Sequence, residues 1–140
     1  MNDKYFIDTN IFVYSFYPES FEKKKIGDNI IKSAITENKG CISYQVIQEF
    51  LNVSTKKFEV PLSFSDCKKY LDKVLAPLCE IFTSVELYHR AIDVMERWQY
   101  SFYDSLIIAA AIQSDCKILY SEDLQHNQKI QSIEIVNPFA

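Results

Sequence analysis

Apolar residues recur along the chain as short continuous runs separated by longer, periodic segments. Five runs have the length of strands and lie at 4–8, 41–43, 79–82, 117–121 and 133–136. Continuous apolar runs of this length are typical of strands buried on both faces of a parallel sheet. The pattern therefore predicts a sheet made of these five strands.

The segments between the runs carry helical signals. A helix is expected to start near Thr9, where Thr9 and Asn10 would cap it. Helical spacing continues as far as "ENKG", and Gly40 lies just past the end of the helical segment. Gly at that place is a common end of a helix. Ser43 is a predicted N-cap for the helix that follows the second strand. That helix is expected to end before Pro61.

Three further helices are expected in the second half of the chain. "SFSD" at 63–66 and "TSVE" at 83–86 have the spacing of capping boxes. The helix after "TSVE" is expected to bury one stripe: Tyr88, Ala91, Ile92, Met95 and Trp98. The segment 103–113 is apolar around its whole circumference, which predicts a buried central helix.

Strands that alternate with helices indicate an α/β domain with a central parallel sheet flanked by helices on both faces. We expect one domain over residues 1–140, because no linker or repeat divides the chain. The four cysteines show no CxxC spacing, so we expect reduced thiols in a cytoplasmic protein. Signal-peptide and membrane-span patterns are both absent from the sequence, and no membrane association is expected.

Four acidic residues are expected to meet at one edge of this sheet. Asp8 ends the first strand amid apolar neighbours, and Asp123 follows the fourth strand. Asp104 opens the buried helix, and Glu49 lies about two turns into the helix after the second strand. In parallel sheets the carboxyl ends of the strands, with the first turns of the following helices, form the working edge.

Each acid also has a structural interpretation. Asp104 is suited to a helix start capped by Ser101, where the helix dipole favours a negative charge. Asp123 is suited to a turn, and Glu49 to a solvated helix face. Asp8 is the hardest to explain without function, since ionised carboxylates are rarely buried unless paired or metal-bound.

Converging carboxylates repel one another and need a counter-cation. Hard oxygen donors favour Mg²⁺ or Mn²⁺ over zinc. The net charge of −4 and the pI of about 5.2 argue against broad, charge-driven nucleic-acid binding. The summed charge of the four acids equals the net charge of the chain, so a local metal site is compatible with this acidity.

The motifs that carry these acids resemble those of PIN-domain ribonucleases, and most closely the VapC-type toxins of toxin–antitoxin pairs. They are "FIDTNIF", "SYQVIQEF", "SFYDSLIIAAA", "LYSEDLQH" and a closing "NPF". The motifs occur in order over nearly the whole chain. At Asn127 the family often has Gly, and Asn also tolerates the left-handed conformation such a turn uses.

The resemblance implies a PIN-like fold and a Mg²⁺- or Mn²⁺-dependent endoribonuclease. It implies that the catalytic and metal-binding residues are Asp8, Glu49, Asp104 and Asp123. Ser121 matches the hydroxyl residue that accompanies the last acid, and Asn10 is expected to orient a site carboxylate. The implied partners are an RNA substrate, a cognate antitoxin protein and a second copy in a homodimer. Cleavage would leave 3′-hydroxyl and 5′-phosphate ends.

Two other classes of function are compatible with parts of the pattern. A non-catalytic module of the same fold would hold metal or RNA without cutting, although the presence of all four acids weighs against it. A metal-dependent phosphatase would need a second Asp two residues after the nucleophilic one, whereas Asp8 is followed by Thr9 and Asn10. The nuclease is the preferred interpretation.

Overall fold

A six-stranded, mostly parallel sheet runs through the computed structural model, which describes residues 3–140. Its strands are β1 (Tyr5–Ile7), β2 (Gly40–Ser43), β3 (Cys79–Ile81), β4 (Ile118–Tyr120), β5 (Lys129–Ile130) and β6 (Ile133–Val136). Their spatial order is β3-β2-β1-β4-β6-β5, and only the β5–β6 pair is antiparallel. All five predicted strands are confirmed, and the short β5 was not predicted.

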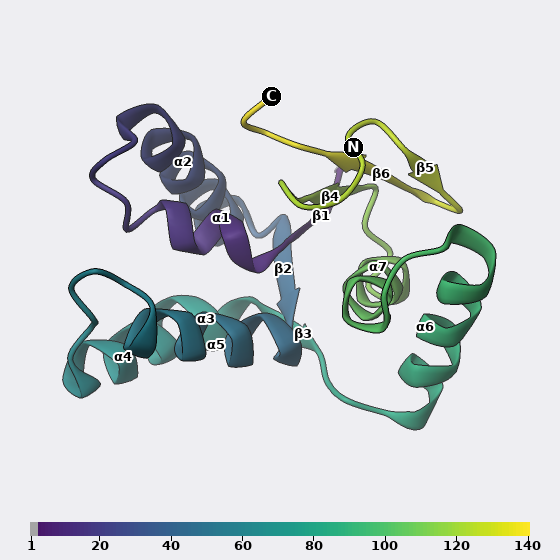
Figure 1. Ribbon diagram of the computed structural model, residues 1–140, viewed down its shortest axis with the longest axis horizontal. Coiled ribbons are helices and arrows are strands. Elements are labelled where there is room, and N and C mark those ends of the chain that lie inside the picture. The colour runs from purple at the N-terminus through teal and green to yellow at the C-terminus, as the bar shows by residue number, and fades with distance from the viewer. Residues whose placement is uncertain (1–2) are drawn as a thin grey trace.

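Helices cover both faces of the sheet, which confirms the predicted fold class. They are α1 (Thr9–Tyr14), α2 (Phe21–Glu37), α3 (Tyr44–Lys56), α4 (Phe64–Tyr70), the π-helix η1 (Leu71–Leu75), α5 (Ala76–Leu78), α6 (Val85–Trp98) and α7 (Phe102–Gln113). Figure 1 shows α6 and α7 on one side of the sheet and the other labelled helices on the opposite side. Among residues 3–140, the helices are too short or too polar to cross a membrane.

The helix starts agree with the predicted caps, with two exceptions. The hydroxyls of Ser63 and Ser84 accept hydrogen bonds from the backbone N–H three residues on, at 3.1 and 3.0 Å. Ser43 lies at the N-cap position of α3, but its side chain makes no capping hydrogen bond. The cap before α1 is Asp8, whose side chain accepts from the backbone of Thr9, so Thr9 is not the cap.

The end of α2 differs from the expectation for Gly40. Asn38 takes the left-handed conformation there, with φ of 56°, and Gly40 already belongs to β2. A Cβ atom on Gly40 would clash with Ala34 and lie 2.9 Å from the ring of Tyr5. Gly40 is therefore explained by the close packing of α2 on the sheet. Asn127 is also left-handed, with φ of 70°, in agreement with its expected role in a turn.

The buried face of α6 is rotated from the predicted stripe. Leu87, Ala91 and Val94 are buried, whereas Tyr88 and Ile92 are 39% and 54% exposed. Both stripes have helical spacing, so periodicity alone did not decide between them. Packing on α7, whose residues 105–111 are buried, selects the stripe with Leu87. This leaves apolar side chains of α6 on the surface.

Candidate active site

Asp8 lies at the carboxyl end of β1 and is only 8% exposed. Its Oδ1 accepts a 2.7 Å hydrogen bond from the backbone of Thr9, and its Oδ2 accepts a 2.8 Å bond from the hydroxyl of Ser121. The pKa of Asp8 is raised to about 7, first by burial and then by the charges of Glu49 and Asp123, while the two hydrogen bonds oppose the rise. A cation bound beside Asp8 would therefore stabilise the ionised form of its carboxyl group.

Asp123 is held beside Asp8 by two polar side chains. Ser121 follows β4, the neighbour of β1, and its hydroxyl accepts a 3.2 Å hydrogen bond from the backbone of Asp123. Asn10 donates a 3.1 Å bond from Nδ2 to Asp123 Oδ2, and its Oδ1 accepts from the backbone of Glu122. The structure therefore brings Asp8, Asp123 and both expected supporting residues together.

Glu49 reaches the same edge from α3. Its Oε1 accepts a 2.5 Å hydrogen bond from the hydroxyl of Thr9, and its Oε2 accepts a 3.0 Å bond from Nε2 of Gln45. The Thr9 contact joins Glu49 to the residue directly after Asp8. These contacts place Glu49 at the site, in contrast to the solvated-face interpretation.

Asp104 lies in the first turn of α7. Its backbone N–H donates to the hydroxyl of Ser101 at 3.3 Å, which is the expected helix cap. Gln45 also donates from Nε2 to the carbonyl of Tyr103 at 3.1 Å, so the start of α7 is tied to α3 beside Glu49. In the described chain no hydrogen bond links Asp104 to the other three acids. Its role as a ligand thus stays a prediction beside its role at the helix start.

A fifth carboxylate, Glu122, borders the site but has its own partners. It accepts a 2.6 Å hydrogen bond from the hydroxyl of Tyr14 and forms a 2.7 Å ion pair with Lys23. Although burial opposes the change, these two contacts lower the pKa of Glu122. Sequence reasoning missed Glu122, Thr9 and Gln45 as neighbours of the acids. Their signal in the sequence was their position inside the same motifs as the acids: Glu122 and Thr9 are adjacent to Asp123 and Asp8, and Gln45 lies one helical turn before Glu49.

The chemistry of these donors fits a hard divalent cation. Carboxylate oxygens of Asp8, Glu49 and Asp123 interact closely enough for the latter two to raise the pKa of Asp8. As positioned, no three acidic, His or Cys side chains within residues 3–140 are grouped tightly enough to hold a metal ion. Thr9, Asn10 and Ser121 instead bind the carboxylate oxygens.

A groove of about 490 Å³ opens in front of these acids. Glu49 and Asp123 lie in its wall together with Thr9 and Asn10, and Tyr17 and Lys57 also line it. The groove is therefore open to a long substrate rather than enclosed around a small one. Its wall combines acids with the aromatic rings of Tyr14 and Tyr17 and the cationic side chain of Lys57.

The fold and this edge of the sheet define the class of protein. The family model of the PIN domain matches residues 5–129. The chain therefore belongs to the PIN domain family, as its motifs indicated. No curated protein matches the sequence.

Several solved structures of toxins share the fold at low sequence identity. A toxin–antitoxin complex from Klebsiella pneumoniae has a TM-score of 0.65 and 17% identity, and the match covers 96% of this chain and 98% of that one. VapC20 of Mycobacterium tuberculosis, described as a sarcin–ricin loop cleaving toxin, has a TM-score of 0.64 and 14% identity, with 86% and 90% covered. FitAcB of Neisseria gonorrhoeae has a TM-score of 0.65 and 15% identity, with 96% and 98% covered.

Proposed function

We propose that this protein is a Mg²⁺- or Mn²⁺-dependent endoribonuclease that hydrolyses RNA to 3′-hydroxyl and 5′-phosphate ends. The observation that carries the proposal is the buried Asp8, whose pKa of about 7 reflects burial and the nearby charges of Glu49 and Asp123. Membership of the PIN domain family supports the same conclusion. The cleavage of the sarcin–ricin loop by VapC20 supports RNA as the substrate class.

The four acids would share the work of binding the cation. Asp8, Asp123 and Asp104 would bind it directly, and Glu49 would complete the site or position the attacking water. The cation would polarise the scissile phosphate and assist ionisation of water. Asp8 would be ionised in the cation-bound protein, and the hydroxyl of Ser121 and the backbone N–H of Thr9 orient its carboxylate.

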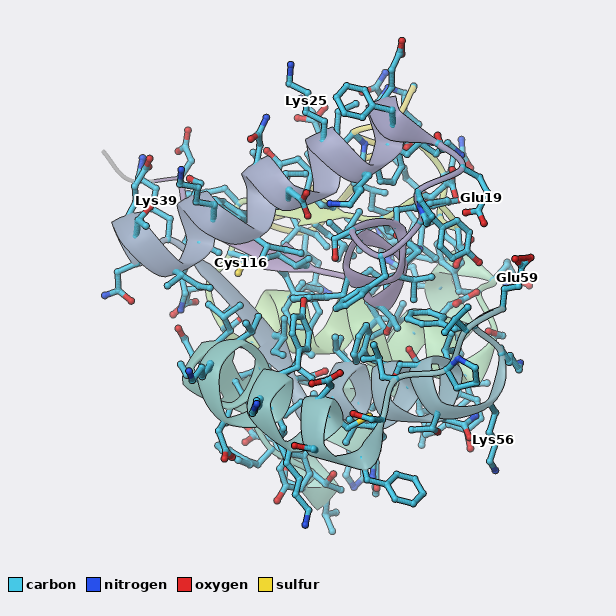
Figure 2. The ribbon with its side chains drawn as sticks, turned by 90° about the vertical axis from the view of Figure 1, so that its left-hand side faces the viewer. Glu19, Lys25, Lys39, Lys56, Glu59 and Cys116 are labelled. Atoms are coloured by element: carbon cyan, nitrogen blue, oxygen red, sulfur yellow. The ribbon has the colours of Figure 1, made fainter. Side chains whose placement is uncertain are left out.

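Binding of RNA requires cationic groups outside the acidic centre. Lys57 lines the groove and is exposed. Lys56 is the last residue of α3, directly before Lys57. Figure 2 shows Lys56 extending away from the body of the molecule, and Lys25 on α2 does the same. Lys57 is therefore our candidate for a contact with an RNA phosphate, whereas Lys25 belongs to a solvated helix face.

The biological setting we propose is a toxin controlled by a cognate antitoxin protein, with the enzyme acting as a homodimer. The similar structures support this setting, because one is a toxin–antitoxin complex from Klebsiella pneumoniae and another is VapBC2 from Rickettsia felis bound to promoter DNA. Co-expression with the protein encoded next to this chain tests it. We expect expression of this chain alone to arrest growth, and co-expression of the neighbouring protein to suppress the arrest.

The direct test is cleavage of total RNA by the purified protein in Mg²⁺, in Mn²⁺ and in excess chelator. We expect cutting only with the cation, and loss of cutting in Asp8→Asn and Asp123→Asn with an unchanged circular dichroism spectrum. Ligation that requires a 5′-phosphate would identify the product ends. Equal cutting in chelator, or 2′,3′-cyclic phosphate ends, would contradict the proposed mechanism.

One observation favours the non-catalytic alternative, a metal- or RNA-binding module of the same fold. In the described residues the acids are bound to Thr9, Asn10 and Ser121 rather than grouped around one point. A folded wild type that binds RNA but releases no fragments with either cation would favour that module.

A further inference from the structure

A second cleft opens at the carboxyl ends of β2 and β3, on the same edge of the sheet as the acids. We call it the aromatic cleft, and it has a volume of about 250 Å³. Its lining includes Ser43, Gln45, Tyr44, Phe82, Tyr88 and Tyr103. Tyr44 and Phe82 pack edge to face at 5.0 Å, while the ring of Tyr103 is 66% exposed. The cleft thus presents aromatic rings to solvent beside the candidate active site.

Two buried polar atoms of the cleft residues lack a partner. They are the hydroxyl of Ser43 and Oε1 of Gln45, on side chains that are 2% and 8% exposed. A buried polar atom without a hydrogen bond destabilises the fold, so such atoms are uncommon in native proteins. A ligand that enters the cleft and displaces the side-chain atoms covering these two groups would supply the missing hydrogen bonds.

The orientation of Gln45 makes its free atom an acceptor. Both hydrogens of Nε2 are used, one for Glu49 Oε2 and the other for the carbonyl of Tyr103. A flipped amide would place its oxygen against these two acceptors. Gln45 Oε1 therefore requires a donor from the ligand, whereas the hydroxyl of Ser43 can donate or accept.

The same side chain links the cleft to the catalytic edge. Gln45 lines the aromatic cleft and also holds Glu49, which lies in the wall of the acidic groove. Tyr103 is the residue before Asp104. A group bound in the aromatic cleft is therefore next to the acids that would act on a phosphodiester.

The geometry points to a binding site for one nucleobase of the single-stranded RNA substrate, next to the scissile phosphate. The base stacks on Tyr103 and Phe82 and donates an amino or imino N–H to Gln45 Oε1. Aromatic stacking combined with hydrogen bonds to base edges is the general mode by which proteins read single-stranded RNA. A phosphate fits less well, because Gln45 Oε1 would face another acceptor. This inference rests on the proposed function.

Binding is tested without cleavage, in excess chelator, with a six-nucleotide single-stranded RNA that carries one central 2-aminopurine. Stacking quenches the fluorescence of this base. We expect strong quenching with wild type and about tenfold weaker binding of the RNA to Tyr103→Ala and Phe82→Ala, which is the loss of roughly one stacking contact. Phe64→Ala, on the exposed surface of α4, is the matched control and should bind like wild type.

A second pair of RNAs tests the hydrogen bonds. Purine riboside lacks the amino group of 2-aminopurine, so an RNA with purine at the same position should bind about tenfold more weakly, as expected for one lost hydrogen bond in a buried site. Equal affinity for both RNAs in wild type would overturn the assignment of the acceptor.

Two results would overturn the nucleobase site itself. The first is equal quenching by wild type and Tyr103→Ala. The second is conversion of a dimer to a monomer by Tyr103→Ala or Phe82→Ala in analytical ultracentrifugation, with RNA affinity unchanged, which would make the cleft a subunit interface. A protein that shows the expected quenching but cuts no RNA would retain this site and reject the nuclease.

Discussion

Ser121 donates a 2.8 Å hydrogen bond to Oδ2 of Asp8, across 113 residues of sequence. The contact exists because β1 and β4 are neighbours in the sheet and both end at this edge. The same hydroxyl accepts from the backbone of Asp123. One buried side chain therefore orients two of the candidate ligands.

Replacement of Ser121 by Ala is expected to raise the pKa of Asp8 above about 7, because it removes a hydrogen bond that stabilises the ionised carboxylate. A hydrogen bond to a charged group contributes about 1.5–3 kcal/mol. The acid limb of the pH–rate profile for RNA cleavage should thus move to higher pH by roughly one to two units. Ser114→Ala is a control, since Ser114 is also buried but bonds to Ala110 at the end of α7. An unshifted profile would contradict the role of Ser121.

The stability of the metal-free protein should fall as pH rises toward neutrality. Asp8 has a pKa of about 7 when folded and about 3.9 when unfolded, so between these values the folded state holds a proton that the unfolded state has released. Stability is therefore lost from about pH 4 to pH 7 and remains reduced above that range. Asp8→Asn lacks this loss, so in chelator its melting temperature should exceed that of wild type by an amount that grows with pH, reaching several degrees. A gap independent of pH would refute the assignment.

The contact between Thr9 and Glu49 can be removed with little change of shape. Thr9→Val keeps the branched side chain and deletes the hydroxyl that donates to Glu49 Oε1. We expect about a tenfold lower rate of RNA cleavage, equivalent to about 1.4 kcal/mol, because Glu49 loses its orientation. Thr55→Val, also on α3, deletes a hydroxyl that bonds only within the helix and should leave the rate unchanged. Equal rates for Thr9→Val and wild type would make the contact incidental.

The sequence predicted the parts of the site that depend on strand order along the chain. Asp8 and Asp123 follow apolar runs, and parallel strands bring their carboxyl ends to one edge. Gln45 lies four residues before Glu49 on α3, so their contact follows from helical spacing. The contact of Thr9 with Glu49 could not be predicted, because it arises only through the packing of α1 on α3. Hydrophobic periodicity describes a single helix or strand, whereas a contact between two helices depends on how the helices are rotated relative to each other.

The same limit explains the error on α6. Its apolar residues form two overlapping stripes, and only the packing of α7 decides that Leu87 is buried and Tyr88 exposed. Tyr88 then becomes part of the aromatic cleft. The surface that we assign to a nucleobase was therefore absent from the sequence interpretation, which counted Tyr88 in the core.

The family resemblance implies that Asp104 is a metal ligand, whereas the structure shows it in the first turn of α7. Titration with Mg²⁺ distinguishes a metal ligand from a helix-start acid. A cation that binds only the folded state stabilises it by about 2.7 kcal/mol at one hundred times its dissociation constant. If Asp104 is a ligand, as we propose, Asp104→Asn should lose most of the Mg²⁺-dependent rise in melting temperature seen for wild type. It should also lose cutting.

As a helix-start acid beside the Ser101 cap, Asp104 would instead contribute through the helix dipole. Asp104→Asn would then melt lower than wild type in chelator, by the effect of about 0.3–1 kcal/mol typical of such acids, and Mg²⁺ would shift both proteins equally. Asp66→Asn is the matched control, because Asp66 occupies the equivalent position in the first turn of α4, where its backbone donates to Ser63. Equal behaviour of the Asp104 and Asp66 variants in the Mg²⁺ series would remove Asp104 from the metal site.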